Sequence, residues 1–176
     1  MISNVEIDCE QLPQYQLLSF NSLSDNAPID SAIGWIIFFI IIYGVTIGGY
    51  IKDLPLIVEQ SIFIFTIEVV LNLLSVYWCF YSYRYKGYAL REHDIIYKTG
   101  VLWRKKTILP FNRIQHIETH QSLVQRKLNI TSIRLFTAGG LKADMVIDGM
   151  DSKISDEMKQ FLLSKIQQEI VLNEQS

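Results

Sequence analysis

The sequence predicts a membrane-anchored protein in which an α-helical hairpin crosses the bilayer and is followed by a small, mainly β domain capped by a C-terminal amphipathic helix. Three observations support this fold class. Two long apolar segments, residues 31–51 and 62–80, lie close together in the first half of the chain. Apolar and polar residues then alternate, as in half-buried strands, up to about residue 147. Residues 154–170 instead show the periodicity of an amphipathic helix.

The first apolar segment, Ser31–Ile51, contains 21 residues and no charge between Asp30 and Lys52. At about 1.5 Å of rise per residue, a helix of this length spans roughly the 30 Å hydrocarbon thickness of a bilayer. We therefore expect a transmembrane helix. Asp30 and Ser31 are suited to cap its N-terminus, where negative charge is favourable.

The second apolar segment, Ile62–Phe80, contains one acidic residue, Glu68. Insertion scales give a cost of about 3 kcal/mol for such an acid, whereas each of the segment's twelve Ile, Leu, Val and Phe residues favours insertion by roughly 0.5 kcal/mol. Insertion of both segments is therefore favoured. The alternative is a buried hairpin in a soluble protein, but the 95 residues that follow residue 81 are too few to cover two wholly apolar helices and form their own core.

Small and polar residues interrupt both apolar segments. Gly44 and Gly48 have the GxxxG spacing that lets another helix backbone approach closely, although incidental glycines of an apolar helix are an equally good interpretation. Glu68 and Asn72 lie one turn apart on a polar stripe, and an intramembrane acid should face protein or water. We interpret these four residues as intramembrane packing positions, with the stripe of Glu68 and Asn72 facing the first helix or another protomer. A proton or ion relay centred on Glu68 is the weaker alternative, because one acid does not form a pathway.

The charge distribution divides the chain into three parts. Residues 1–30 form an acidic N-terminal tail with five Asp or Glu and no Lys or Arg, and residues 31–81 form the two-helix transmembrane hairpin. Residues 82–176 form a domain in which 15 Lys and Arg stand against 10 Asp and Glu. This modest basic surplus lies beside the membrane, so we do not expect nucleic acid as a ligand.

Basic residues also predict the topology, because Lys and Arg near a helix end resist translocation. Arg84, Lys86 and Arg91 closely follow the second helix, whereas the connection between the helices contains only Lys52. We therefore expect both termini in the cytoplasm, with the domain of residues 82–176 on that side of a multi-pass protein.

After the membrane segments, the chain is expected to form consecutive antiparallel strands and one helix. The final helix, Ile154–Ile170, carries an apolar stripe and is capped by Ser155. A small barrel or a pair of sheets with this helix closing an open end is the natural packing. The expected strands, of which the second and third are joined by a tight turn at Thr99 and Gly100, are Tyr83–Leu90, Asp94–Lys98, Val101–Leu109, Arg113–His120, Ile130–Thr137 and Ala143–Ile147.

Four fragments in this region resemble the bacterial pleckstrin-homology-like (PH-like) membrane proteins of the YdbS type. They are Ile95–Leu102 (IIYKTGVL), Leu109–Gln115 (LPFNRIQ), Gln121–Ile130 (QSLVQRKLNI) and Thr137–Gly140 (TAGG). Their order and spacing carry the resemblance, which covers about residues 30–170 and includes the two preceding helices.

The resemblance implies a PH-like fold, a seven-stranded bent barrel or sandwich capped by a C-terminal helix, tethered beneath the bacterial inner membrane. Asn129 stands where the family often has Gly, a mild change because Asn tolerates the left-handed conformation. The acidic tail of residues 1–30 is unlike the short basic lead of the family, which leaves its role open.

The sequence shows no catalytic constellation, and we expect neither an enzyme nor a cofactor. His116, Glu118 and His120 alternate on one strand face, so a metal site is conceivable, but a polar strand face is the simpler interpretation. Gly139 and Gly140 lack the strand-to-helix context of a dinucleotide loop.

Basic residues of the domain are the candidate contacts with lipid headgroups or a protein partner: Arg104, Lys105, Lys106, Arg113 and Arg126. Near anionic headgroups each can contribute about 1 kcal/mol. Solvated strand faces or edge protection are the alternative. Arg113 and Arg126 also suit structural bonds to loop carbonyls or to a carboxylate such as Glu118.

These observations lead to three functional hypotheses. The first is a non-enzymatic, membrane-anchored PH-like module that scaffolds or interacts with other membrane proteins, through self-association or a homologous membrane protein. The second is a module that binds or senses anionic lipid headgroups. The third is a small transporter or proton-relay subunit that uses Glu68.

Overall fold

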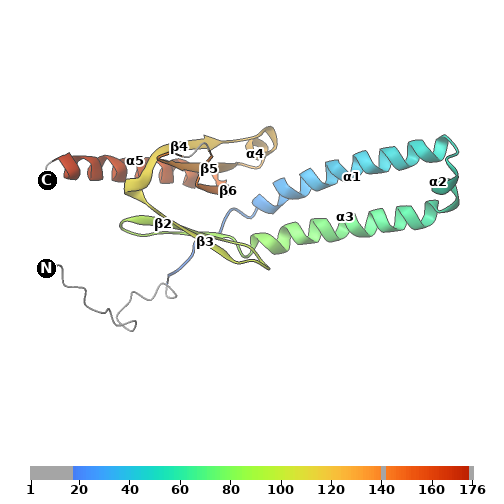
Figure 1. Cartoon of the computed structure of the whole chain (residues 1–176), viewed down its shortest axis with the longest axis horizontal. Coiled ribbons are helices and arrows are strands. Elements are labelled where there is room, and N and C mark those ends of the chain that lie inside the picture. Colours follow the sequence, from blue (N-terminus) through green and yellow to red (C-terminus); the bar gives the residue numbers. More distant parts are fainter. Residues whose placement is uncertain (1–17, 140–141, 175–176) are drawn as a thin grey trace.

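The computed structural model of the protein describes residues 18–139 and 142–174. A helical hairpin projects from a β domain (Figure 1). The long helices of the hairpin are α1, Ala27–Ile51, and α3, Ser61–Tyr83, and the short helix α2, Pro55–Glu59, lies at its far end. The expectation of two long apolar helices is confirmed.

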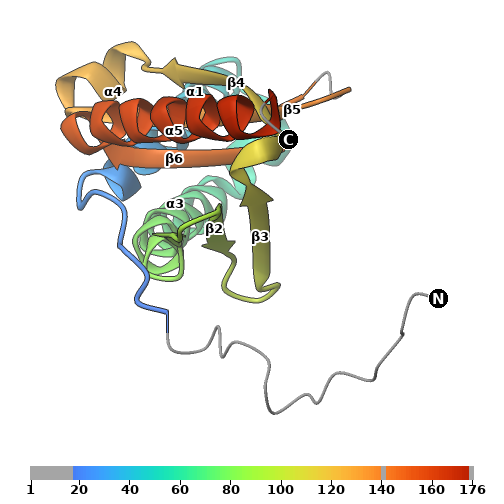
Figure 2. The same cartoon turned by 90° about the vertical axis from the view of Figure 1, so that its left-hand side faces the viewer.

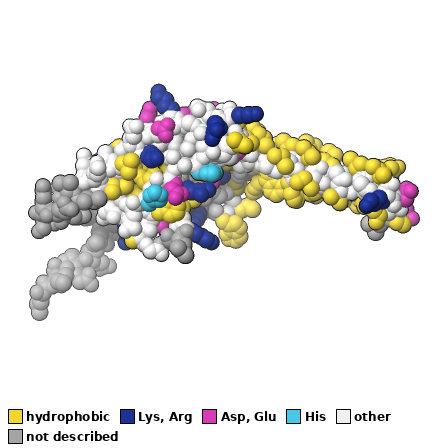
Figure 3. All heavy atoms as spheres, turned by 90° about the horizontal axis from the view of Figure 1, so that it is seen from above, with side chains coloured by type: hydrophobic (Ala, Val, Ile, Leu, Met, Phe, Trp, Pro, Cys, Tyr) yellow, Lys and Arg dark blue, Asp and Glu magenta, His cyan; other side chains and the backbone are white. Residues whose placement is uncertain are grey.

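Hydrophobic side chains cover the visible face of the hairpin along most of its length (Figure 3). Helices α1 and α3 are each long and apolar enough to cross a membrane. Only 22% of the most apolar stretch of α1 and 11% of that of α3 is buried within the structure. The core helix of a soluble protein is mostly buried, so this exposure favours lipid as the surrounding medium.

Helix α1 begins at Ala27, four residues before Ser31, and Ala27 is fully buried against the β domain. The prediction that Asp30 and Ser31 cap the helix is wrong, because both residues lie inside it. The Asp30 carboxylate instead accepts a hydrogen bond from Gln125 Nε2 at 2.9 Å. The Ser31 hydroxyl lies 3.1 Å from the hydroxyl of Tyr83, at the end of α3. The start of α1 is therefore anchored in the domain.

The β domain contains two antiparallel three-stranded sheets in the order β1-β2-β3 and β4-β5-β6. Figure 2 shows helix α5 lying along the second sheet, with the first sheet below them. The strands are β1, Gly87–Leu90, β2, Asp94–Thr99, β3, Lys105–Pro110, β4, Ile114–His120, β5, Ile130–Thr137, and β6, Met145–Asp151.

The two sheets do not close into the barrel that was one of the expectations, and the described residues form six named strands rather than seven. A closed barrel needs backbone pairing between the sheets. Strand β3 ends at Pro110, and the 3₁₀ turn η3, Phe111–Arg113, then redirects the chain into β4. The first sheet therefore ends before the second begins, and the result is the pair of sheets that the sequence also allowed.

Several boundaries differ from the predictions. Strand β1 begins at Gly87 rather than Tyr83, because α3 continues to Tyr83. Strand β3 begins at Lys105 rather than Val101, so residues 100–104 form a loop and not a tight turn. Asn129 has a φ of 55°, so the position is left-handed, a conformation that Asn tolerates.

Helix α4, Leu123–Lys127, was not predicted. It is stabilised by a capping box, in which Ser122 Oγ accepts a hydrogen bond from Gln125 N and Gln125 Oε1 accepts one from Ser122 N. The pattern of a polar residue followed three positions later by Gln was present in the sequence as a signal for this start.

Helix α5, Ser152–Glu174, closes the second sheet as expected, but it begins before Ile154. Asp151 Oδ1 accepts a hydrogen bond from the backbone N–H of Lys153 and so caps the helix. The prediction that Ser155 is the cap is wrong, because its hydroxyl is buried and has no partner within the described part of the chain. Met158 and Leu162 insert from α5 into the core.

The hydrophobic core lies between the two sheets and includes residues just before and at the start of the hairpin. Leu23 and Ala27 belong to the same cluster as Ile95, Ile133 and Leu162. Residues 21–27 form a strap across the domain, in which the backbone of residue 21 pairs with that of residue 88 of β1 and the N–H of residue 24 donates to the carbonyl of residue 149 of β6. The chain thus contributes to the domain before it enters the hairpin.

Replacing Gly149 by Ala should destabilise the protein strongly. Gly149 has a φ of 82°, and a Cβ there would lie 2.3 Å from Ala27 Cβ. The left-handed backbone should cost about 1–2 kcal/mol and overpacking a further 1–3 kcal/mol. Gly139→Ala is the matched control, because Gly139 has a φ of 86° with no atom within 4 Å of its added Cβ. Thermal unfolding of the full chain in detergent measures the melting temperature of both variants. Equal decreases in melting temperature would contradict the packing argument.

Candidate functional site at the base of the hairpin

The base of the hairpin is fixed to the β domain from both helices. On the α1 side, the Gln125 amide of α4 joins Asp30, and Asn26 Nδ2 donates to the Leu128 carbonyl at 3.1 Å. On the α3 side, Tyr83 packs against the domain core and lies beside the backbone of Gly149. Both helices therefore leave the domain in directions that its own packing determines.

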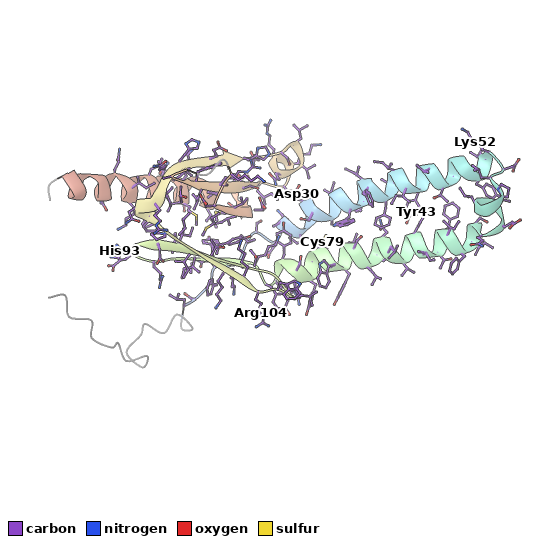
Figure 4. The ribbon with its side chains drawn as sticks, in the orientation of Figure 1. Asp30, Tyr43, Lys52, Cys79, His93 and Arg104 are labelled. Carbon is purple, nitrogen blue, oxygen red and sulfur yellow. The ribbon has the colours of Figure 1, made fainter. Side chains whose placement is uncertain are left out.

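A basic pocket of about 330 Å³ lies where α3 meets the end of the first sheet. Arg84 and Tyr85 contribute from the end of α3, and Gly100 and Arg104 contribute from the loop between β2 and β3. Figure 4 shows Arg104 beside the end of α3. Five lining residues of the pocket are basic: Arg84, Lys98, Arg104, Lys105 and Lys106.

The sequence predicted three of these five cations, Arg104, Lys105 and Lys106, and the structure brings them together in one pocket. Arg84 and Lys98 were missed as members, because they lie six to twenty residues earlier in the chain. The Lys98 Nζ lies 4.4 Å from the centroid of the Phe20 ring, a cation–π contact with the segment before the strap. Only the tertiary fold places these segments side by side.

The other two predicted cations lie elsewhere. Arg113 is exposed in η3, next to Phe111, whose N–H donates to the His93 carbonyl. Figure 4 places His93 at the end of the domain away from the hairpin. Arg126 is exposed on α4, near the base of the hairpin. The predicted carboxylate partner Glu118 instead contacts His116 at 3.3 Å.

Glu68 lies inside the hairpin, where its side chain is 8% exposed. Thr46 Oγ1 donates to Glu68 Oε1 at 2.6 Å, and Glu68 Oε2 has no hydrogen-bond partner among the described residues. Asn72 is half-buried one turn away. This contact favours packing within the hairpin over a relay, because one oxygen of the acid is bonded to a side chain of the neighbouring helix. Thr46 was not predicted as the partner of Glu68, although a hydroxyl group within an apolar segment was a signal for such a role.

Gly44 and Gly48 face away from α3. A Cβ at either position would meet no atom within 4 Å. The glycine that allows a close approach inside the hairpin is Gly49, where a Cβ would lie 2.3 Å from Ile57 Cδ1. The GxxxG pair is therefore available to a helix outside the hairpin.

The titratable groups of the described domain have structural surroundings. No group of three or more His, Cys, Asp and Glu side chains that could hold a metal ion occurs in residues 18–139 and 142–174. Burial raises the pKa of the Tyr97 hydroxyl far above its ordinary value, so this group stays protonated at neutral pH. Hydrogen bonds from Thr137 lower the pKa of Asp144.

Two candidate membrane spans joined to a small β domain at the base of the hairpin suggest a membrane protein. A family model described as the bacterial PH domain matches residues 32–166. That range covers most of the chain, and the protein therefore belongs to the bacterial PH domain family. Its two sheets and closing helix are consistent with a PH-like fold.

One curated protein resembles part of the chain. The UPF0699 transmembrane protein YdbS of Bacillus subtilis (strain 168) is 31% identical over 51 residues, which make up 29% of this chain and 32% of YdbS. The chain thus matches about a third of the length of this relative. No solved structure matches the chain.

Proposed function

We propose that the protein is a non-enzymatic, membrane-anchored PH-like module that holds its β domain at the bilayer surface and scaffolds other membrane proteins. The supporting observation is the buried start of α1: Ala27, the last residue of the strap and the first of α1, is fully buried against Gly149 of β6. Because the hairpin is built into the core, the bilayer would fix the orientation of the domain. A partner in the same membrane would then meet a defined surface.

A second copy of the chain or a homologous membrane protein is the proposed partner within the bilayer. The open face of α1 at Gly44 and Gly48 supports this, because small residues let two helix backbones approach closely in lipid. Ile41 lies one turn before Gly44 on the same face and is largely exposed. The face that α1 directs away from α3 is therefore suited to a helix–helix contact.

A photoreactive residue at Ile41 should crosslink this partner in native membranes. Replacing both Gly44 and Gly48 by Leu should reduce the crosslinked product several-fold, because the larger side chains would keep the second backbone away. Electrophoresis and mass spectrometry would identify the product. Ile36→Leu is the control, since Ile36 is exposed on another face of the same helix. Products that contain only lipid, or an unchanged yield in the glycine variant, would contradict the proposal.

We place both termini and the β domain in the cytoplasm of a bacterial cell, with the hairpin crossing the inner membrane twice. Arg84 and Lys86 at the end of α3, against Lys52 alone at the tip, support this orientation. In a chain with Cys9 and Cys79 replaced by Ser, an impermeant thiol reagent should label Lys52→Cys on spheroplasts. It should label Glu92→Cys only after disruption. The reverse pattern would refute this topology.

Binding of anionic lipid headgroups is a second candidate function. The basic pocket supports it, because its five cations gather at the end of a helix that would leave the bilayer at that level. Such cations are attracted to anionic headgroups within a Debye length, about 10 Å at 0.1 M salt. A phosphate group bearing negative charge fits this chemistry.

Charge reversal in the pocket should reduce the anionic lipid that stays bound. For Arg104→Glu we expect several-fold less anionic phospholipid to co-purify with the full-length protein. The additional anionic phospholipid that the wild-type protein binds should decrease with added salt. Mass spectrometry of the extracted lipids measures the ratio of anionic to zwitterionic species. Arg113→Glu makes the same charge change at the far end of the domain and should leave the ratio unchanged. Equal effects of both variants would rule out a role for the pocket.

A further inference from the structure

The loop between β2 and β3 exposes two large apolar side chains to an unusual degree. Leu102 is 77% exposed and Trp103 is 89% exposed, whereas the two strands that the loop joins contribute Ile95, Tyr97 and Leu109 to the core. Single exposed hydrophobic residues are common, but an adjacent Leu and Trp at a loop tip indicate a contact with something outside the chain.

The conformation of this loop is fixed by Gly100. Gly100 has a φ of 94°, and a Cβ there would lie 1.9 Å from the carbonyl oxygen of Trp103. The chain therefore turns sharply at Gly100 and brings the backbone of Trp103 back against it. The exposure of Leu102 and Trp103 thus results from a turn that only glycine permits.

The loop lies at the same end of the domain as the hairpin. Gly100 and Arg104, which flank the two apolar residues, line one pocket together with Arg84 and Tyr85 from the end of α3. Figure 4 shows Arg104 next to the end of this helix. Both ends of the loop therefore lie within one pocket's width of the point where α3 would leave the bilayer.

Aromatic residues on α3 mark that level. The rings of Tyr77 and Tyr81 are stacked with centroids 6.1 Å apart, and the Tyr81 and Tyr85 hydroxyls lie 2.9 Å apart. Trp and Tyr are enriched at the membrane–water interface, where one end of the side chain is apolar and the other is hydrated. Tyr85, the last of these tyrosines, lines the same pocket as Gly100 and Arg104, which flank the loop tip.

The opposite side of the hairpin base has a similar feature. Leu123 of α4 is 77% exposed, and exposed Arg126 and Lys127 follow it on the same short helix. Figures 1 and 2 show α4 and the β2–β3 connection on opposite sides of the hairpin base. Exposed apolar residues flanked by basic ones thus occur on both sides of the two helices, which is the pattern of an interfacial membrane contact.

We propose that residues 101–103 are a third membrane element, a loop whose Leu102 and Trp103 insert into the interfacial layer of the bilayer that α1 and α3 cross. Arg104 and Arg84 lie beside them at headgroup level. The occupant of this surface is lipid, because the loop borders the end of a candidate span. This inference rests on the proposed function insofar as the hairpin must be in the membrane.

Three single-tryptophan variants of the full chain test the inference, each retaining Trp35, Trp78 or Trp103 with the other two replaced by Phe. Each is reconstituted into vesicles of phosphatidylcholine and phosphatidylglycerol, with or without bromine atoms on the upper acyl chain. Trp103 should emit at short wavelength and lose intensity on brominated lipid, because bromine quenches only on contact. Acrylamide in the aqueous phase should quench Trp103 less than an exposed tryptophan.

The matched control moves the probe to the other end of the same sheet. His93→Trp in a chain with all three native Trp replaced by Phe places an exposed indole in the β1–β2 turn, away from the hairpin (Figure 4). This probe should emit at long wavelength. Acrylamide should quench its fluorescence, whereas brominated lipid should not. A Trp103 signal that matches this control would overturn the inference. A Trp103 signal that is shifted but insensitive to bromine would assign the loop to a protein contact and would also overturn it.

The other two tryptophans separate this inference from the proposed function. Trp35 in α1 and Trp78 in α3 lie within the candidate spans. If brominated lipid quenches both of them but not Trp103, the hairpin is inserted and only the loop inference fails. If it quenches none of the three, the membrane anchor itself is refuted.

Discussion

The contact between Ala27 and Gly149 is the constraint on which the rest of the structure depends. Ala27 is the first residue of α1 and is fully buried, and Gly149 of β6 leaves no room for a Cβ beside it. Two segments more than a hundred residues apart thus share one point of close packing. Because α1 begins inside the core of the β domain, the hairpin and the domain form one packed unit.

In the proposed function, this unit determines which surface of the domain faces the bilayer. The strap of residues 21–27 crosses the domain, and Tyr83 packs from α3 onto the same core, so both helices leave from one end. The basic pocket and the loop with Leu102 and Trp103 lie at that end. A flexible tether would let the domain present any surface to the membrane. A helix that starts in the core restricts it to one.

The elements that could be predicted from the sequence are those with strong local signals. An uncharged run of 21 residues predicts a spanning helix whatever follows it, and the alternation in residues 130–137 gave strand β5 with correct bounds. Local signals failed where a tertiary contact competes with them. Asp30 has the chemistry of a helix cap, but α1 already begins at Ala27, where it packs against the domain. The Asp30 carboxylate instead accepts a hydrogen bond from Gln125. Val101 to Arg104 resemble a strand, but Gly100 turns them into a loop.

The candidate site was only partly accessible to sequence reasoning. Arg104, Lys105 and Lys106 are adjacent in the chain and could be predicted as a basic cluster. Their companions Arg84 and Lys98 come from α3 and β2, and no periodicity links those positions. Likewise, Glu68 could be assigned to a packing face, but its partner Thr46 lies on the other helix. Which side chains of two distant segments meet depends on how the tertiary fold aligns those segments.

By itself the sequence determined the two apolar helices, the strand-rich domain and the closing helix, because hydrophobic periodicity and length act within a single segment. Only the tertiary structure decided that residues 21–27 belong to the domain core, that the sheets remain open, and which cations share a pocket. The physical reason is that these features arise from packing between distant segments, where the space left by one residue, such as Gly149, determines what another can occupy.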